Sequence, residues 1–246
     1  MRYLVLACDY DGTLAADGRV EAATVKALEN LLATGRKLLL VTGRELPDMR
    51  AIFQRLDLFE WVIAENGALL YRPSRQEQKR LAEPPPAKFV QALRQRGVSP
   101  LSVGEVIVAT VQPHETTVLQ VIADMGLELQ IIFNKGSVMV LPAGVNKATG
   151  LTAALKEMGL SPENVVGIGD AENDHAFLSL CGCAVAVANA LPALQEKADF
   201  VTRGGPGAGV VELIGELLAT AAEGLEGRRN SGSQDLYRNA PSEPGA

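Results

Sequence analysis

The chain has 246 residues, 47% of them hydrophobic, and a formal net charge of −6. This size and composition predict a globular protein with one large core or two smaller ones. The acidic balance argues against nucleic-acid and anionic-membrane partners, and no apolar run approaches the roughly 18 residues that span a bilayer. The apolar N-terminal stretch ends in acidic residues, not in a signal-peptide cleavage site, so we expect a cytoplasmic protein.

Strand and helix patterns alternate in the first third of the chain. The strands are continuous apolar runs, as is typical of parallel strands buried on both faces. This alternation predicts a parallel sheet with helices on both sides. The elements are expected at residues 2–8 (strand), 20–34 (helix), 37–41 (strand), 45–56 (helix) and 61–64 (strand).

The pattern changes after residue 72. Residues 72–80 are polar and basic, and Pro84-Pro85-Pro86 can continue neither a helix nor a strand. We expect residues 83–142 to form an inserted, smaller α/β cap domain with a hairpin turn at Asn134-Lys135-Gly136. Its expected elements are helices at 87–96 and 115–125 and strands at 105–111, 127–133 and 137–141.

The first pattern resumes at residue 143. Further helices are expected at 147–159, at 173–180 and up to about residue 222, and further strands at 165–168, 184–187 and 200–202. The predicted fold class is therefore α/β, with a Rossmann-like, doubly wound parallel core sheet built from residues 1–82 and 143–223. The composition of residues 224–246 predicts a disordered tail.

Two carboxylates, Asp9 and Asp11, stand one residue apart at the carboxyl end of the first buried strand. Repulsion and desolvation both oppose their ionisation unless a cation or a reaction uses them. Such a pair suits a magnesium-assisted carboxylate nucleophile, because Mg²⁺ prefers oxygen ligands. Taken alone, the pattern is as typical of a turn or a metal-binding loop as of such a catalytic site.

Three further elements follow at the carboxyl ends of predicted strands or at a helix start, where open α/β sheets bind ligands. They are Thr42-Gly43-Arg44, Lys147, and the segment from Gly169 to Asp174. Together with Asp9-x-Asp11-Gly12-Thr13, this ordered set resembles the four motifs of the haloacid-dehalogenase-like phosphohydrolase superfamily, over residues 1 to about 218. The insertion, which follows Glu65-Asn66-Gly67-Ala68, resembles the type-two-capped branch of sugar phosphatases, archaeal-type phosphoglycolate phosphatases and phosphomannomutases.

The resemblance implies roles for the acidic residues. Asp9 would be the nucleophile that forms an aspartyl-phosphate, and Asp11 would be the general acid and base. Mg²⁺ would bind the Asp9 and Asp170 carboxylates and the Asp11 carbonyl, while Asp174 would act on it through a bound water.

The remaining motif residues would contact the phosphoryl group. By the resemblance these are Thr42, Gly43, Arg44, Lys147 and Asn173. Two alternatives stay open: Arg44 is equally typical of a salt-bridge partner, and Asn173 could instead hold Lys147 in place. In the cap, Lys135 and His114 are candidates for substrate contact, although such residues are more often solvated.

We therefore expect a Mg²⁺-dependent phosphatase that acts on a small phosphorylated metabolite, a sugar phosphate or a similar organophosphate. A phosphomannomutase-like phosphotransferase is the first alternative, but it would need an arginine cluster in the cap, where only Arg94 and Arg96 stand together. A non-catalytic metabolite-binding protein on the same fold is the second. Such a protein would be expected to have lost motif carboxylates, which are all present here. No oligomeric state is predicted.

Overall fold

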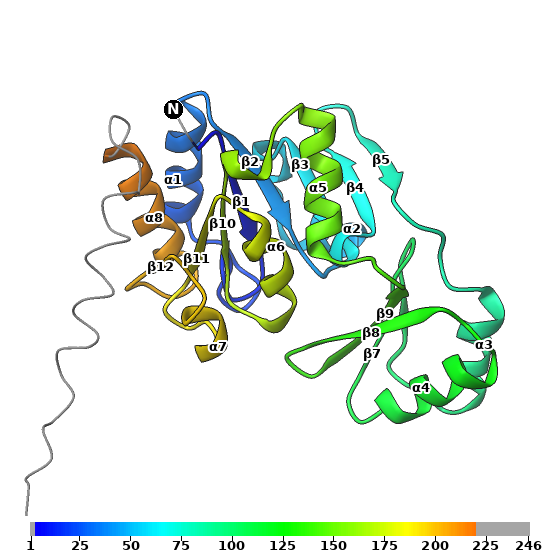
Figure 1. The fold of residues 1–246 in the computed structure, drawn as a ribbon. Coiled ribbons are helices and arrows are strands. Elements are labelled where there is room, and N and C mark those ends of the chain that lie inside the picture. The colour runs from blue at the N-terminus through cyan, green and yellow to red at the C-terminus, as the bar shows by residue number, and fades with distance from the viewer. Residues whose placement is uncertain (1–2, 220–246) are drawn as a thin grey trace, which may run out of the picture.

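The structure is a computed structural model that describes residues 3–219. These residues form two β-sheets (Figure 1). The larger sheet has eight strands in the order β12-β11-β10-β1-β2-β3-β4-β5, and the smaller has four in the order β6-β7-β9-β8. The predicted tail at 224–246 lies outside the described residues.

Six strands of the large sheet run parallel, with β1 (Val5–Asp9) at the centre between β2 (Lys37–Val41) and β10 (Val165–Gly169). All five residues of β1 are buried, as expected for a strand covered on both faces. The other parallel strands are β3 (Trp61–Ala64), β11 (Cys183–Ala186) and β12 (Phe200–Val201). The α/β fold class and the parallel-dominated Rossmann-like sheet are thus confirmed.

The helices lie on both faces of the large sheet because the chain winds outward from β1 in two directions. Right-handed crossovers to β2 on one side and from β10 to β11 on the other place the connecting helices on opposite faces. Helix α1 (Ala22–Leu32) packs against α8 (Ala208–Ala219), and α5 (Lys147–Met158) packs against α6 (His175–Leu180) (Figure 1). The direction of winding changes between β1 and β10, which is where such sheets bind ligands.

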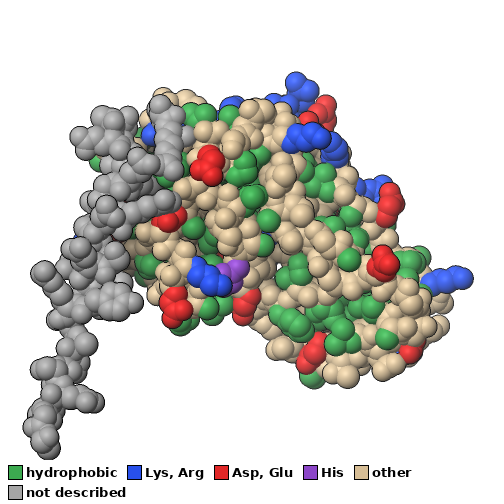
Figure 2. Space-filling model, viewed as in Figure 1, with side chains coloured by type: hydrophobic (Ala, Val, Ile, Leu, Met, Phe, Trp, Pro, Cys, Tyr) green, Lys and Arg blue, Asp and Glu red, His purple; other side chains and the backbone are tan. Residues whose placement is uncertain are grey.

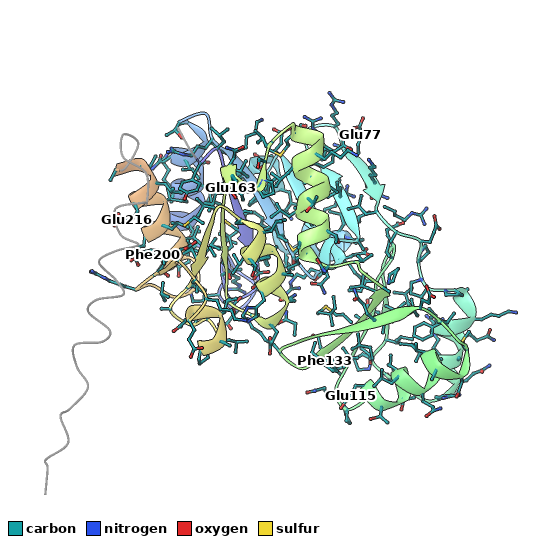
Figure 3. The ribbon with its side chains drawn as sticks, viewed as in Figure 1. Glu77, Glu115, Phe133, Glu163, Phe200 and Glu216 are labelled. Atoms are coloured by element: carbon teal, nitrogen blue, oxygen red, sulfur yellow. The ribbon has the colours of Figure 1, made fainter. Side chains whose placement is uncertain are left out.

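Two strands at one edge of the large sheet were not predicted. The residues after β3 form an antiparallel hairpin of the largely buried β4 (Leu69–Arg72) and the polar β5 (Glu77–Arg80). All four side chains of β5 are exposed, so this edge strand carries no apolar pattern that would reveal it. In Figure 3, Glu77 marks this edge, and Phe200 marks β12 at the opposite edge.

Several predicted elements are shorter in the structure. The helix expected over 45–56 ends early as α2 (Leu46–Ile52), and a separate turn, η1 (Leu56–Leu58), follows it. The helix expected over 173–180 begins as the turn η4 (Glu172–Asp174) before α6. Helix ends fray into such turns, which periodicity does not resolve.

The small sheet is antiparallel throughout and is built from residues 102–142. Its strands are β6 (Ser102–Val103), β7 (Val108–Val111), β8 (Leu129–Asn134) and β9 (Ser137–Pro142). The strand expected over 105–111 begins only at Val108, and β6 was not predicted. Helices α3 (Ala87–Gln95) and α4 (Glu115–Asp124) pack on one face, where they enclose Phe89, Leu93 and Val121.

The other face of the small sheet is turned toward the large sheet. We refer to the small sheet with α3 and α4 as the cap, and to the large sheet with its helices as the core. Along β9 the side chains alternate, so that Val138 and Val140 pack with α3 and α4 while Met139 and Leu141 pack with Ala68 of the core. The β8–β9 hairpin points to the carboxyl ends of the parallel strands (Figure 1). In the space-filling view the small sheet and its helices form the lower right part of the molecule (Figure 2).

Among the described residues, no helix combines the length and the apolar character needed to cross a membrane.

Candidate active site

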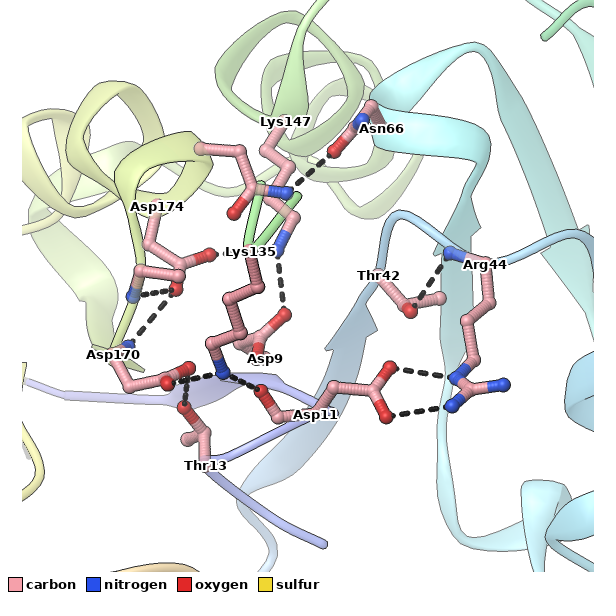
Figure 4. A network of polar contacts seen from close by, with 12 residues as sticks. Asp9, Asp11, Thr13, Thr42, Arg44, Asn66, Lys135, Lys147, Asp170 and Asp174 are labelled. Carbon is pink, nitrogen blue, oxygen red and sulfur yellow. Dashed lines mark hydrogen bonds and ion pairs between the residues drawn. The ribbon is translucent and has the colours of Figure 1, made fainter. Parts of the chain in front are cut away.

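Polar side chains from four separated segments meet at the carboxyl edge of the large sheet (Figure 4). Asp9 ends β1, Thr42 follows β2, Lys147 begins α5, and Asp170 follows β10. All four are buried. Because buried charged groups are costly unless they are paired, their joint burial here indicates a site and not a solvated surface.

Lys147 lies at the centre of the site. Its Nζ is 2.5 Å from Asp9 Oδ1 and 2.6 Å from Asp174 Oδ1. The helix start that presents Lys147 is capped by Asn146, whose side chain accepts the N–H groups of Ala148 and Thr149. Burial alone would lower the pKa of Lys147, but the charges of Asp174 and Asp9 outweigh it and raise that pKa, so the ammonium stays charged.

Asp174 uses both carboxylate oxygens within the protein. Oδ1 accepts from Lys147, while Oδ2 accepts the backbone N–H groups of Asp170 and Ala171, each at 2.9 Å. These charge-assisted bonds hold the loop after β10 and the lysine in one arrangement. Asp174 therefore holds Lys147 and the loop after β10 in place.

The site carries more negative than positive charge. Carboxylate oxygens of Asp9, Asp170 and Asp174 all lie within 4.8 Å of one another. Burial, and then the charge of Asp174, raise the pKa of Asp9, and burial is also the main cause that raises the pKa of Asp170. A carboxylate cluster of this kind is stabilised by a cation, and its oxygens suit a hard divalent metal.

A lysine from the cap reaches into this cluster. Lys135, at the tip of the β8–β9 hairpin, places Nζ 2.7 Å from Asp170 Oδ2 and 3.0 Å from the backbone oxygen of Asp11. Burial would lower the pKa of Lys135, but the hydrogen bond and charge of Asp170 raise it. Gly12, with φ +89°, leaves room for this contact, since a Cβ there would lie 2.5 Å from both Lys135 Nζ and Asp170 Oδ2.

Asp11 points away from Asp9, toward a guanidinium. Arg44 Nε and Nη2 donate to the two Asp11 carboxylate oxygens at 2.6 and 2.8 Å, and Nη1 donates to Asp48. Arg44 is thus the salt-bridge partner that one of our two interpretations expected. Its contact with a phosphoryl group stays a prediction.

Thr42 and Gly43 lie beneath the cap. The Thr42 hydroxyl oxygen accepts the backbone N–H of Arg44 at 3.1 Å, so its own hydrogen can be donated elsewhere. A Cβ at Gly43 would lie 3.3 Å from Asn66 Oδ1 and 3.4 Å from Met139 Sδ, so a larger residue there would require these side chains to shift by a few tenths of an ångström.

Among the described residues, Asn173 makes no hydrogen bond to Lys147. Its Nδ2 donates to Asn66 Oδ1 at 2.9 Å, and its Oδ1 is buried without a hydrogen-bond partner in the described part of the chain. Asn66 in turn donates to Met139 Sδ in the cap. Sequence analysis placed Asn66 and Thr13 in motifs but gave neither a role in the site; the Thr13 hydroxyl donates to Asp170 Oδ1 at 3.1 Å.

A cavity of about 570 Å³ opens between the site and the cap. The core contributes acidic and basic groups to its wall, and the cap contributes mainly neutral ones. His114 is not among the lining residues, and its ring lies at Ser99 of the cap, with Nε2 2.9 Å from the carbonyl oxygen. The lining residues include Asp9, Asp11 and Arg44 from the core and Ser102, Asn134, Lys135 and Ser137 from the cap.

The family model for haloacid dehalogenase-like hydrolases matches residues 6–109 and 127–214. This match covers most of the chain, including all four motifs and both sheets. The chain therefore belongs to the haloacid dehalogenase-like hydrolase family, as the motif resemblance indicated.

Individual relatives agree with this assignment. The chain is 33% identical over 222 residues to a phosphoglycolate phosphatase of Methanothermobacter thermautotrophicus, an alignment that covers 87% of this chain and 98% of the relative. It is 34% identical over 206 residues to a phosphoglycolate phosphatase of Halorubrum lacusprofundi, which covers 80% and 89% of the two chains.

Solved structures share the fold at low sequence identity. A haloacid dehalogenase-like hydrolase from Bacteroides thetaiotaomicron superimposes with a TM-score of 0.75 at 18% identity, over 87% of this chain and 99% of the other. A subclass IIB sugar phosphatase of the same superfamily gives 0.72 at 20% identity, over 87% and 98%. These two neighbours support the fold.

Proposed function

We propose that the chain is a Mg²⁺-dependent phosphatase that hydrolyses a small phosphorylated metabolite through an aspartyl-phosphate on Asp9. The observation that carries the proposal is the buried Lys147, which pairs with Asp174 and with Asp9, and Asp9 lines the cavity. A buried cation beside a strand-end carboxylate offers both a nucleophile and a positive charge for phosphoryl oxygens. The archaeal relatives named phosphoglycolate phosphatases support phosphate-ester hydrolysis as the reaction class.

In the first step, an Asp9 oxygen would form a bond to phosphorus while the bond to the ester oxygen breaks. Asp11 would give a proton to that departing oxygen. In the second step, Asp11 would take a proton from water, whose oxygen then attacks the phosphorus and releases Asp9 and inorganic phosphate. In this structure both Asp11 oxygens accept hydrogen bonds from Arg44, so for the first step Asp11 must have taken up a proton and turned from Arg44 toward the cavity that both residues line. It would be left as a carboxylate by that step, and the proton it takes from water in the second step restores the acid.

The phosphoryl group would be held by groups that already face the site. Lys147 supplies a fixed positive charge, and Thr42 has a hydroxyl hydrogen to donate. We keep Gly43 in this set because its lack of a side chain lets a phosphoryl oxygen approach the backbone beneath Met139. Asn173 is better placed to hold Asn66 than to bind the substrate.

The proposed metal ligands are the Asp9 and Asp170 carboxylates and the Asp11 carbonyl oxygen, and Asp174 would act only through a water. The residues fit a cation, because the Lys135 ammonium already lies between Asp11 O and Asp170 Oδ2. Asp174 has each oxygen engaged by protein donors, which argues against direct coordination. When bound, Mg²⁺ would neutralise charge on the phosphoryl oxygens and on the nucleophile.

The cavity wall suggests which leaving groups fit. The cap provides one cation, Lys135, among the described residues that line the cavity, together with Ser102, Asn134 and Ser137. Asn134 Oδ1 is buried and has no hydrogen-bond partner in residues 3–219. A short phosphorylated carboxylic acid could pair with Lys135, and a sugar phosphate could use the neutral groups. We rank phosphoglycolate first for testing, because several relatives carry that name.

The cap favours a phosphatase over a phosphomutase. A mutase must grip a second phosphate, yet no cap arginine is among the described residues that line the cavity, and Arg96 pairs instead with Asp124. The non-catalytic alternative is disfavoured because Asp9, Asp170 and Lys147 meet in one charged cluster.

A direct test measures phosphate release by the purified protein with Mg²⁺. The substrates would be phosphoglycolate, a panel of sugar phosphates and p-nitrophenyl phosphate. We expect hydrolysis of p-nitrophenyl phosphate and faster hydrolysis of at least one metabolite. No release from any ester with Mg²⁺ or Mn²⁺ would contradict the proposal, and release only in the presence of a sugar bisphosphate activator would favour the mutase.

A further inference from the structure

The turn after β3 is part of the core and is hydrogen-bonded to a loop of the cap. Glu65 begins this turn and its side chain is fully buried. Its Oε1 accepts the backbone N–H of Glu105 at 2.9 Å, and its Oε2 accepts those of Val106 and Ile107 at 2.7 and 2.9 Å. All three donors belong to the cap, in the loop between β6 and β7.

The surroundings of this carboxylate are apolar. Ala68, Val106, Ile107, Met139 and Leu141 form one buried cluster across the boundary between core and cap. A carboxylate in such a place is costly without donors, and three charge-assisted hydrogen bonds compensate for its burial. Gly104 completes the fit, since a Cβ at that position would lie 2.7 Å from Glu65 Oε1.

The loop held by Glu65 leads directly to the hairpin above the active site. Ile107 precedes β7, and β7 pairs with β9 up to Val111 opposite Ser137. Gln112 then donates its N–H to the carbonyl of Gly136 at the hairpin tip. Because these strands are hydrogen-bonded to one another, the position of the loop sets the position of Lys135.

The core side of the same turn contacts the phosphate-binding segment. Glu65 N donates to Arg44 O, and Asn66 N donates to Thr42 O, both at 3.0 Å. Glu65 and Asn66 have φ values of 52° and 53°, a left-handed conformation that Asn adopts readily but that is rare for Glu and here is held by the contacts of Glu65. This one turn is therefore hydrogen-bonded both to the cap loop and to Thr42 and Arg44 of the core.

We propose that Glu65 is a positioning residue that fastens the cap to the core and sets where Lys135 lies over Asp11 and Asp170. The catalytic consequence rests on the proposed function, but the fastening itself does not. Loss of the fastening should free the hairpin and release Lys135 from Asp170, while the core sheet remains folded.

Two variants remove the fastening from opposite sides. Glu65→Gln keeps the shape of the side chain but turns an NH₂ group toward a backbone N–H, so at least one hydrogen bond is lost. Gly104→Ala leaves Glu65 intact and inserts a methyl group into its contact with the loop. The Gly104→Ala variant keeps the test decisive if a change at the buried Glu65 prevents folding. Glu105→Gln is the matched control, because the Glu105 side chain pairs only loosely with Arg80, at 3.7 Å, on the outside of the same loop.

The main readout is the rate at which an amine-reactive reagent modifies each lysine in EDTA, followed by mass spectrometry. We expect Lys135 to react about tenfold faster in Glu65→Gln and Gly104→Ala, the change that corresponds to losing one hydrogen bond to a charged group. Lys79, paired with Glu157 on the core surface, serves as the internal reference and should not change. Hydrogen exchange at residues 105–107 should accelerate in the same two variants.

Unchanged Lys135 reactivity in a folded variant would overturn the proposal, as would equal acceleration at every lysine, which indicates general destabilisation. A kinetic measurement separates the catalytic consequence: KM for phosphoglycolate should rise about threefold or more while kcat for p-nitrophenyl phosphate stays within about twofold. If the wild type hydrolyses no phosphate ester, the proposed function fails, and the labelling result still decides the role of Glu65.

Discussion

The two sheets of this protein place charged residues at the site in different ways. The eight-stranded sheet collects its charged residues at the ends of buried parallel strands, where the backbone fixes them and burial enforces pairing. The four-stranded sheet brings one charged residue, Lys135, to the same place on a half-exposed hairpin. On the proposed function, the core would bind the phosphoryl group common to all substrates, and the cap would contact the part of the substrate that differs among metabolites.

The largest effect is expected in the core. Asp9→Asn should reduce kcat by about 10⁴-fold or more, because an amide cannot attack phosphorus. The side chain keeps nearly the same shape, so circular dichroism and the melting temperature should report an intact fold. Turnover within tenfold of the wild type would exclude Asp9 as nucleophile.

Metal dependence should also be a property of the core alone. EDTA should abolish activity, and Asp170→Ala should raise the Mg²⁺ concentration for half-maximal rate by about tenfold to a hundredfold. A thermal-shift titration with Mg²⁺ gives a readout without turnover, since metal that binds only the folded state raises the melting temperature. Full activity in excess EDTA would refute this assignment.

A smaller and selective effect is expected in the cap. At saturating Mg²⁺, Lys135→Ala should lower kcat/KM for phosphoglycolate by about tenfold, while p-nitrophenyl phosphate changes by less than about threefold. The matched control is Lys79→Ala, which removes a paired surface lysine far from the cavity. Equal losses of kcat/KM with both substrates would mean that Lys135 acts on the phosphoryl group, and would contradict a role limited to the leaving group.

The smallest predicted effect is a pH-dependent difference in stability. In metal-free protein, burial and then the charge of Asp174 raise the pKa of Asp9, so the unfolded state gives up this proton more readily than the folded state. The wild type should therefore lose stability as the pH rises above the ordinary carboxyl range of about 4, and Asp9→Asn should lack the part of this loss that comes from Asp9 while it keeps the part that comes from Asp170. At pH 8 without metal we expect the variant to melt about 2–4 °C higher. A wild type that is the more stable at pH 8 would contradict the assigned charge balance.

The core could be predicted from sequence because its signals are local. Apolar runs mark strands buried on both faces, and the polar residues that interrupt them stand at the strand ends, as with Val41 and Thr42. Strand β5 was missed for lack of such a signal, since residues 77–80 are all exposed and show no periodicity. Strand β4 does carry the signal, because residues 69–71 are apolar and buried, and it could have been predicted.

The contacts between core and cap could not be predicted. Lys135 meets the Asp11 carbonyl across 124 positions of sequence, and no local pattern distinguishes it from a solvated hairpin lysine. Glu65 stands in a recognisable turn sequence, but its partners are backbone N–H groups, which every loop offers. Such pairings depend on how two sheets meet, and that is decided by packing and not by the pattern of either segment.

The central claim, that Asp9 receives the phosphoryl group, is tested most directly by trapping it. In Asp11→Asn, p-nitrophenyl phosphate can still transfer its phosphoryl group because the nitrophenolate leaves without a proton, but the base that activates water is gone. Acid quench and peptide mass spectrometry after mixing with Mg²⁺ should then find one phosphoryl group on the peptide that contains Asp9, and none in Asp9→Asn. If Asp11→Asn turns over the ester while this peptide stays unmodified, or if the group lies on another residue, the account of the active site is wrong.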